Sequence, residues 1–492
     1  MTSQKTDTAS AKADTASQKR GGTNQQFGAA SRERQRSPKE CQRSPKERGL
    51  IAPRQLGFLF AAFLPLNKVV FLPALFAAEA GHALLYPLIL SLLFDFCTLV
   101  LVMTLAVRGE GFPAVLYSAF GRVGGKIILA LLAATLLVQA TLPLGEERLL
   151  IQLGLYETAP SLFYVAPLFV FGYFLLQKSP TVVGRAADLA VFATVAALGA
   201  TLLFALPSAK MQRLLPLLPQ KWGGVWRAVQ NGALSFGEGL YPLFLLGKFP
   251  AEKRENRKIY SGFLMGAGLT VCFFALFYAV FGALAPDVPF ALTDIAKHNL
   301  SGLNIGRVDY FSVFILLGTA CVGLLLPAYF AARCLQLLFG KEDFSASGVD
   351  TAHFAERGSC PACENKKGGK QGACSKKLRK GFFFCHRRAL ISAGVTLALF
   401  CFTAFSESRF ATLSGALRSW FFPAAMIMRL LLPLLLLAHS ALRGAEKTDA
   451  EKERDAEKTD AEKEEETCAE KRKDQNPCGK KFQNKNKENA VR

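Results

Sequence analysis

Histidine is scarce in this sequence, and the common catalytic motifs are absent from it. Only five histidines occur among 492 residues, and three of them (His298, His353 and His386) stand in polar loops. The sequence has no phosphate-binding loop, no glycine-rich dinucleotide fingerprint, and no Ser/His/Asp or Cys/His pattern typical of a catalytic set. We therefore expect no enzymatic activity and no cofactor.

Long polar stretches are also rare between residues 56 and 442. A bilayer core about 30 Å thick requires about 20 helical residues to span it, and helices satisfy their own backbone hydrogen bonds in lipid. The sequence predicts an all-α membrane protein with about ten transmembrane helices. The apolar runs that predict them are 57–78, 83–107, 127–144, 161–176, 186–206, 231–246, 261–284, 311–339, 390–405 and 411–442.

The net charge of +21 does not indicate a nucleic-acid partner, because the basic residues stand in tails and in loops between the apolar runs. We divide the chain into an N-terminal tail (1–55), a permease-like membrane domain (56–442) that includes a large cytoplasmic loop (340–388), and a C-terminal tail (443–492). Both tails are repetitive and poor in apolar residues, which predicts disorder. Their basic residues suit either plain solvation or contact with anionic lipid headgroups.

The large loop carries a possible metal site. Cys360-Pro-Ala-Cys363 could bind one tetrahedral zinc ion if two further ligands came from Cys374 and Cys385 or His386. The alternative is a set of reduced thiols without a ligand. The cysteines inside apolar runs predict small buried residues rather than disulfides.

Three ionisable residues stand near the middle of predicted helices: Lys68, Asp95 and Glu238. A charge at mid-membrane costs about 2.5–3.5 kcal/mol on insertion scales, so it usually faces a partner or a wet cavity. Lys68 and Asp95 could form a buried ion pair between consecutive helices, or they could belong to a ligand or proton site. Both alternatives remain open at this stage.

The first and sixth predicted helices contain residues that interrupt helices. Pro65-Leu-Asn-Lys68 and Pro73 stand in the first run, and Ser235-Phe-Gly-Glu-Gly239 with Pro242 stands in the sixth. Interruptions at corresponding places predict an inverted-repeat transporter fold with its binding site at midplane, whereas the simpler alternative is a tolerated proline kink. The predicted ligand-binding residues are Pro65, Asn67, Lys68, Ser235, Gly237, Glu238 and Gly239.

Several short segments, in their order and spacing, resemble one known family. They are Ala77-Ala-Glu-Ala-Gly81-His, Ala119-Phe-Gly-Arg-Val-Gly-Gly-Lys126, Tyr156-Glu-Thr-Ala-Pro160, Gly184-Arg-Ala-Ala-Asp188, Ser235-Phe-Gly-Glu238 and Gly306-Arg-Val-Asp309-Tyr. Residues 56–442 thereby resemble the permease-like B subunit of spore germinant receptors, within the amino acid–polyamine–organocation superfamily.

The resemblance implies ten helices in a five-plus-five inverted repeat and a nutrient-sensing role in the inner spore membrane or the cell membrane. It also implies partners, namely an A-type membrane subunit and a lipoprotein C-type subunit. The sequence departs from the family where Asn67 and Lys68 replace expected small residues, and in its long tails and cysteine-bearing loop.

Three functions therefore remain open. The chain could sense a small nutrient such as an amino acid as a receptor subunit. It could transport an amino acid with Glu238 carrying a proton. It could also be a structural subunit whose ligand site has degenerated.

The loop charges predict that both termini face the cytoplasm or the spore core, because lysine and arginine favour that side. A reporter fused after Arg492 should be inaccessible to impermeant labels in intact cells, whereas one placed between residues 287 and 307 should be labelled. Labelling of the C-terminal reporter alone would contradict this topology.

Overall fold

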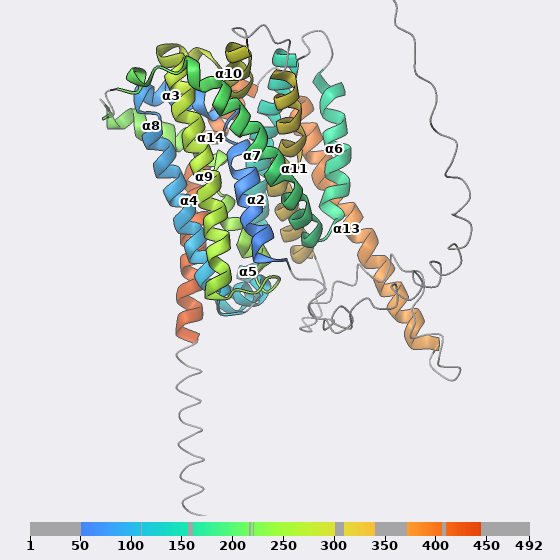
Figure 1. Cartoon of the computed structure of the whole chain (residues 1–492). Coiled ribbons are helices and arrows are strands. Elements are labelled where there is room, and N and C mark those ends of the chain that lie inside the picture. The colour runs from blue at the N-terminus through green and yellow to red at the C-terminus, as the bar shows by residue number, and fades with distance from the viewer. Residues whose placement is uncertain are drawn as a thin grey trace, which may run out of the picture. The chain divides into compact units, whose positions relative to one another are not determined.

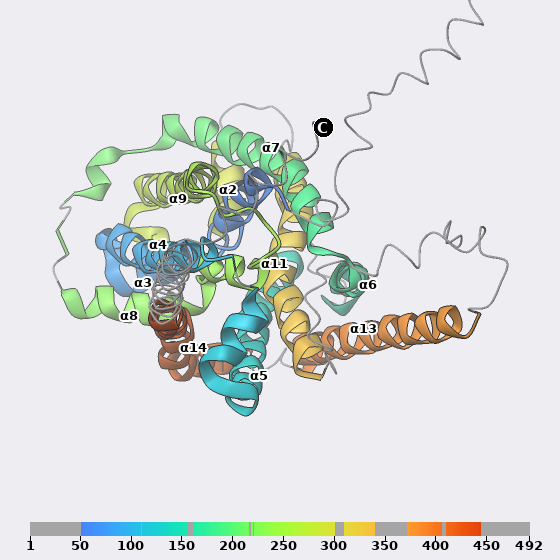
Figure 2. The same cartoon turned by 90° about the horizontal axis from the view of Figure 1, so that it is seen from below.

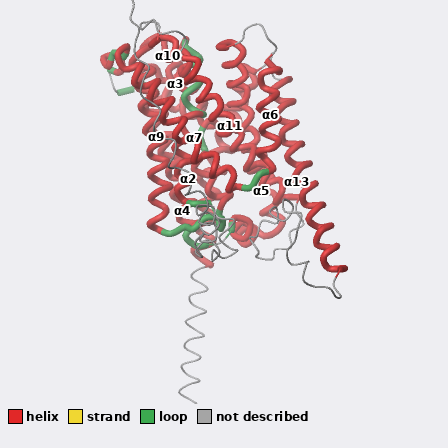
Figure 3. Tube along the Cα trace, turned by 45° about the vertical axis from the view of Figure 1, so that its right-hand side comes forward, coloured by secondary structure: helices red, strands yellow, loops and turns green. Residues whose placement is uncertain are grey.

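The computed structural model describes residues 51–109, 111–155, 161–215, 218–219, 221–300, 309–339, 371–405 and 410–443. These residues are helical with short connections, and no strand occurs among them (Figures 1 and 3). The α-helices are α2 (Pro53–Leu66), α3 (Leu72–Ala80), α4 (Leu85–Ala106), α5 (Phe112–Leu149), α6 (Ser161–Gln177), α7 (Pro180–Ala205), α8 (Trp222–Gly232), α9 (Lys253–Phe281), α10 (Ala291–Leu300), α11 (Asp309–Phe339), α13 (Gln371–Phe405) and α14 (Phe410–Met426).

Seven helices among the described residues are long and apolar enough to cross a membrane alone. The helix α6 is shorter but apolar, and it coincides with the fourth predicted span. The first and sixth predicted spans are each built from shorter helices joined at an interruption. The all-α membrane class is thus confirmed, while the count of ten and the inverted repeat stay predictions.

The first predicted span is interrupted as expected. The helix α2 carries Pro65 in its last turn and ends at Leu66, and α3 begins at Leu72 with Pro73 in its first turn. Proline removes a backbone donor and clashes with the preceding turn, so the helix ends here. The residues between the two helices have no regular helical structure.

The sixth predicted span is interrupted as well, but it begins nine residues earlier than the run 231–246 indicates. The helix α8 continues through a short turn, η7 (Ala233–Ser235), and the chain resumes as the 3-10 helix η8 (Glu238–Leu245). Gly237 between them has φ 114°, a value that glycine adopts without strain. The polar residues of α8 are the reason why the apolar run in the sequence begins later than the helical segment itself.

Two other boundaries differ from the predicted ones. The helix α13 begins at Gln371, so the last part of the predicted loop 340–388 is helical, since it is free of proline and rich in strong helix formers. The helix α5 runs from Phe112 to Leu149, well beyond 127–144, with non-helical torsions at Gly121. Glu147 and Arg148, which follow the predicted run 127–144, are buried in its last turn.

The helix α10 was not predicted, and it lies against the first interruption. The Ala291 N–H at its start donates to the Val70 carbonyl (2.9 Å), and the helix packs on α7 and α11. A carbonyl freed by the interruption thus gains a partner from the following connection.

Seen along the helix axes, α2 and α11 lie between α5, α7 and α9 (Figure 2). The helix α2 packs against α9 and α7, while α11 packs against α5. Close approach between α2 and α9 depends on small residues: a side chain at Gly262 would overlap the Gly57 carbonyl, and one at Gly266 would come within 2.7 Å of the Phe60 carbonyl oxygen. Small residues that bring backbones together are typical of membrane helix packing.

We expect Gly262→Ala to destabilise the fold by about 1–3 kcal/mol, because the new methyl group must push α9 away from α2. The matched control is Gly268→Ala on the same helix, where a Cβ has nothing within 4 Å. Thermal unfolding of both purified variants in one detergent checks this. Equal midpoints for the two variants would contradict the packing described.

Candidate functional site

The two interruptions meet at a buried ion pair. Lys68 follows α2, and its Nζ lies 2.6 Å from Glu238 Oε1 at the start of η8, with the two side chains 0% and 2% exposed. The same ammonium donates to the Leu64 carbonyl (3.2 Å), which lacks its usual helical partner, and stands 4.8 Å from the centre of the Phe236 ring. Lys68 therefore closes the end of α2 and joins the first interruption to the sixth.

Asp95 lies opposite, in the middle of α4. Its Oδ1 accepts a hydrogen bond from the Gly239 N–H (3.1 Å), one of the free donors in the first turn of η8. A carboxylate at a helix N-terminus is favourable because it satisfies a free donor and faces the positive end of the helix dipole. A side chain at Gly239 would overlap the Asp95 backbone, so only glycine permits this approach.

Arg429 supplies the partners on the other side of the interruption. It stands in a π-helical turn, η11 (Ile427–Leu431), and its guanidinium donates to the Ala233 carbonyl (2.5 Å) and to the Phe236 carbonyl. Gln139 of α5 also donates to the Phe236 carbonyl (2.7 Å). The guanidinium lies directly on Gly237, where a Cβ would come within 2.5 Å of Nε.

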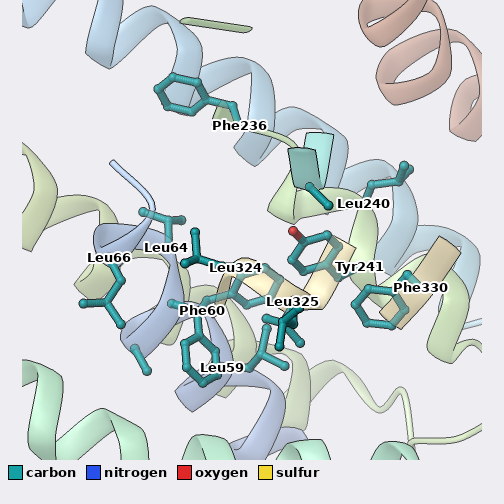
Figure 4. Close-up of a cluster of buried hydrophobic side chains, with 14 of the residues drawn as sticks. Leu59, Phe60, Leu64, Leu66, Phe236, Leu240, Tyr241, Leu324, Leu325 and Phe330 are labelled. Atoms are coloured by element: carbon teal, nitrogen blue, oxygen red, sulfur yellow. The ribbon is translucent and has the colours of Figure 1, made fainter. Parts of the chain in front are cut away.

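Aromatic and aliphatic side chains enclose this polar centre. Tyr241 is fully buried and packs on Phe330 of α11 with ring centres 4.9 Å apart, while Phe60 of α2 lies in the same cluster (Figure 4). Within the described part of the chain, the Tyr241 hydroxyl has no hydrogen-bond partner. Water is thus largely excluded, which strengthens every electrostatic interaction inside.

The centre is electrically balanced but not fully hydrogen-bonded. Lys68 and Arg429 balance Asp95 and Glu238 when all four are ionised. Among the residues that the structure describes, Asp95 Oδ2, Glu238 Oε2 and Ser91 Oγ are buried without a hydrogen-bond partner. A small pocket beside Asp95, with room for about one water molecule, is lined by Ser91, Thr98, Phe236 and Arg429 among others.

The structure assigns different places to the predicted ligand-binding residues. Lys68, Glu238, Gly237 and Gly239 come together at the centre. The Pro65 carbonyl accepts from the backbone N–H of Lys68 (2.9 Å).

Asn67 lies against Gly323 of α11, where an added Cβ would come within 3.3 Å of Asn67 Oδ1. That oxygen is buried and has no hydrogen-bond partner among the described residues. Ser235 is buried in η7 and directly precedes Phe236.

The predicted Lys68–Asp95 ion pair is not formed. Within the described residues, the ion-pair partner of Lys68 is Glu238, and Asp95 instead caps η8. The physical reason is that the interruption turns Lys68 back towards η8, which the sequential order of the first two helices does not reveal.

Sequence reasoning missed Arg429 and Gln139. A lone arginine between Pro423 and Pro433 in the last apolar run was a usable signal, because ionisable residues inside membrane helices are rarely without function. Gln139 had no comparable signal.

A second polar cluster lies near the end of α5. Glu146 pairs with Arg418 of α14, and Arg418 also donates to the Asn231 carbonyl (2.7 Å) at the end of α8. Arg148 donates to the Thr403 carbonyl of α13 (2.5 Å). These contacts join α5, α8, α13 and α14 around the interrupted helix.

Half of the predicted zinc site lies outside the described residues, because these do not include Cys360 and Cys363. Cys374 and Cys385 both stand in α13, eleven positions apart, which corresponds to about 16 Å along a helix. The zinc site therefore stays a prediction. Among the residues that the structure describes, no group of potential metal ligands is found.

Removing one partner of the central ion pair should be more harmful than removing both. Lys68→Met or Glu238→Met alone leaves a buried unpaired charge, which costs about 3–5 kcal/mol, whereas the double variant should recover much of the loss. Thermal unfolding of the purified protein measures this.

The control is the surface pair of Lys258 and Glu255, with 2.8 Å between Nζ and Oε2, where the same changes should have little effect. If the stability losses of the two single variants simply add in the Lys68→Met/Glu238→Met double variant, the pairing is contradicted.

Comparison with known proteins agrees with this architecture. A family model described as spore germination protein matches residues 51–349, more than half of the chain, including both interruptions and Lys68, Asp95 and Glu238. No curated protein matches the chain. The chain therefore belongs to the spore germination protein family, and the seven membrane-length apolar helices among its described residues make it a permease-like, multi-pass membrane protein.

Proposed function

We propose that this chain is the permease-like subunit of a spore nutrient germinant receptor and that it senses a small nutrient, an amino acid, at the centre where the two interruptions meet. The observation that carries the proposal is the buried Lys68–Glu238 pair between two interrupted helices. In inverted-repeat transporters such interruptions hold the substrate at midplane.

The charges at the centre support an amino acid as the ligand. An amino-acid zwitterion adds one positive and one negative group, so it leaves the balance of Lys68, Arg429, Asp95 and Glu238 unchanged. Its ammonium could bind the free oxygens Asp95 Oδ2 and Glu238 Oε2. Its carboxylate could take over donors from Arg429 or Lys68, and both exchanges keep every buried charge paired.

The small size of the pocket favours sensing over free passage. With room for about one water beside Asp95, a ligand must displace internal contacts to enter. Arg429 is the group to be displaced, since it occupies the carbonyls of Ala233 and Phe236 and covers Gly237. A ligand that releases Arg429 would free η11 from the sixth segment, and that change could be transmitted to partner subunits of the A and C types.

The second candidate is a proton-coupled amino acid transporter, favoured by the unpartnered carboxylate oxygens at the centre. The third is a structural subunit with a degenerate site, which the closed packing also suits. These three functions differ in what the isolated chain and the assembled complex can do.

Substitutions at Glu238 and Gly237 test the sensing role in spores. Glu238→Gln keeps the size but removes the charge, and it should raise the amino-acid concentration needed for half-maximal germination by about tenfold or more. Gly237→Leu should abolish the response because its side chain would occupy the space of Arg429. The control is Glu255→Gln, an acid in a surface pair at the start of α9.

Two further measurements separate the alternatives. Each variant must still co-purify with the partner subunits, so that loss of assembly is not mistaken for loss of sensing. Unchanged concentration dependence in both variants would favour the structural role. Uptake of labelled amino acid into vesicles containing this chain alone would favour the transporter.

A further inference from the structure

The start of α5 folds back on itself at Gly121. This residue has φ 70° and ψ 179°, so it separates a short first helix (112–120) from the long remainder of α5. A Cβ at Gly125 would come within 2.6 Å of the Tyr117 ring, although eight residues of a straight α-helix cover about 12 Å along the axis. The bend therefore brings the short helix onto the first turns that follow Gly121.

Two basic residues, Arg122 and Lys126, stand in these first turns after the bend. Both are exposed, and neither forms an ion pair with any residue that the structure describes. They are four positions apart, so their side chains leave the same face of the helix. Because no charged residue occurs from 127 to 145, they are the last charges before the apolar part of α5 begins.

An exposed apolar stripe begins beside this basic pair. Val123, Ile127 and Leu131 are 74%, 57% and 48% exposed, and their spacing of four places them along one face of α5. In a helix that spans a bilayer, such a face contacts the acyl chains of lipids. The long side chains of Arg122 and Lys126 can extend from the edge of this stripe to the level of the headgroups.

The bend lies at the end of the bundle where the described chain begins (Figure 1). The Ile51 N–H donates to the Lys248 carbonyl (2.9 Å), and a Cβ at the neighbouring Gly247 would come within 3.3 Å of Gly111 Cα, just before α5. The loop charges predict that this end faces the cytoplasm or the spore core. Anionic lipids concentrate in the leaflet on that side of a membrane.

We propose that Arg122 and Lys126 bind the phosphate of an anionic phospholipid, whose acyl chain lies along Val123, Ile127 and Leu131. The guanidinium offers two parallel donors to the phosphate oxygens, and the ammonium adds a compact positive charge. A zwitterionic headgroup brings a cation of its own beside the pair, so it binds less well. The site is separate from the centre, and the proposal does not depend on which of the three functions the chain performs.

Native mass spectrometry of the purified, delipidated full chain tests the proposal with phosphatidylglycerol as the probe. The wild type should retain one tightly bound phosphatidylglycerol and bind phosphatidylcholine less tightly. The double variant Arg122→Gln/Lys126→Gln should weaken the binding of phosphatidylglycerol by about tenfold or more, because each basic residue near the lipid surface contributes to it. The swap Arg122→Lys/Lys126→Arg keeps both charges and should retain most of the affinity.

The start of α9 provides a matched control. Arg254 and Lys258 are exposed with the same spacing of four, but Lys258 pairs with Glu255 at 2.8 Å, and the following Ile259 is buried. The variant Arg254→Gln/Lys258→Gln removes two charges from a place without an adjoining apolar stripe. It should therefore leave the affinity for phosphatidylglycerol unchanged.

A photoactivatable phosphatidylglycerol locates the site in the wild type without any substitution. Its cross-links should fall on residues 121–131, and cross-links only elsewhere would overturn the proposal even if a variant failed to fold. Equal affinity in the wild type and in the Arg122→Gln/Lys126→Gln variant would overturn it as well, and so would an equal loss in the α9 control. Inorganic phosphate should not displace the lipid at similar concentration; displacement would indicate a plain anion site instead.

Discussion

The centre of this protein is governed by the need to give the freed backbone groups of the two interrupted segments partners away from water. Interrupting a helix inside a bilayer exposes donors and acceptors, and each unsatisfied group costs several kcal/mol. Four side chains from four different places supply the partners: Arg429 and Gln139 bind carbonyls, Asp95 binds the Gly239 N–H, and Lys68 binds the Leu64 carbonyl and Glu238. The interruption thereby fixes how α2, α4, α5 and η11 pack.

Because most of the partners are charged, the same contacts that satisfy the backbone also build the candidate site. Glu238 balances Lys68, and Asp95 together with Glu238 balances Arg429 across Gly237. Lys68 stands at the end of α2 and Arg429 on the free carbonyls, which are places that a ligand ammonium or a metal cation could otherwise occupy. The side chains of Lys68 and Arg429 thus fill these places, so any ligand at the centre would have to compete with internal contacts that also hold the fold together.

The sequence was most informative about helix existence and about the presence of interruptions. Ten apolar runs coincide with described helices or helix pairs, and Pro65, Pro73 and Gly237 identify both breaks. Boundaries were wrong where polar residues belong to a helix, as at Trp222–Gly232 and Glu147. Ion-pair partners were not predictable, because the rotation of each helix about its axis follows from packing contacts such as Gly57 on Gly262 rather than from local pattern.

The π-helical turn at Arg429 links this closed centre to a possible response. A π-turn carries an extra residue relative to the α-helix and is frequent at functional sites. Here it presents the guanidinium to the carbonyls of Ala233 and Phe236. If Arg429 is released, η11 no longer gains those hydrogen bonds, and the relative stability of the π-helical and α-helical arrangements changes. A small ligand can shift this equilibrium only by its differential affinity for the two arrangements. Displacing one internal cation provides such a difference without requiring a large cavity.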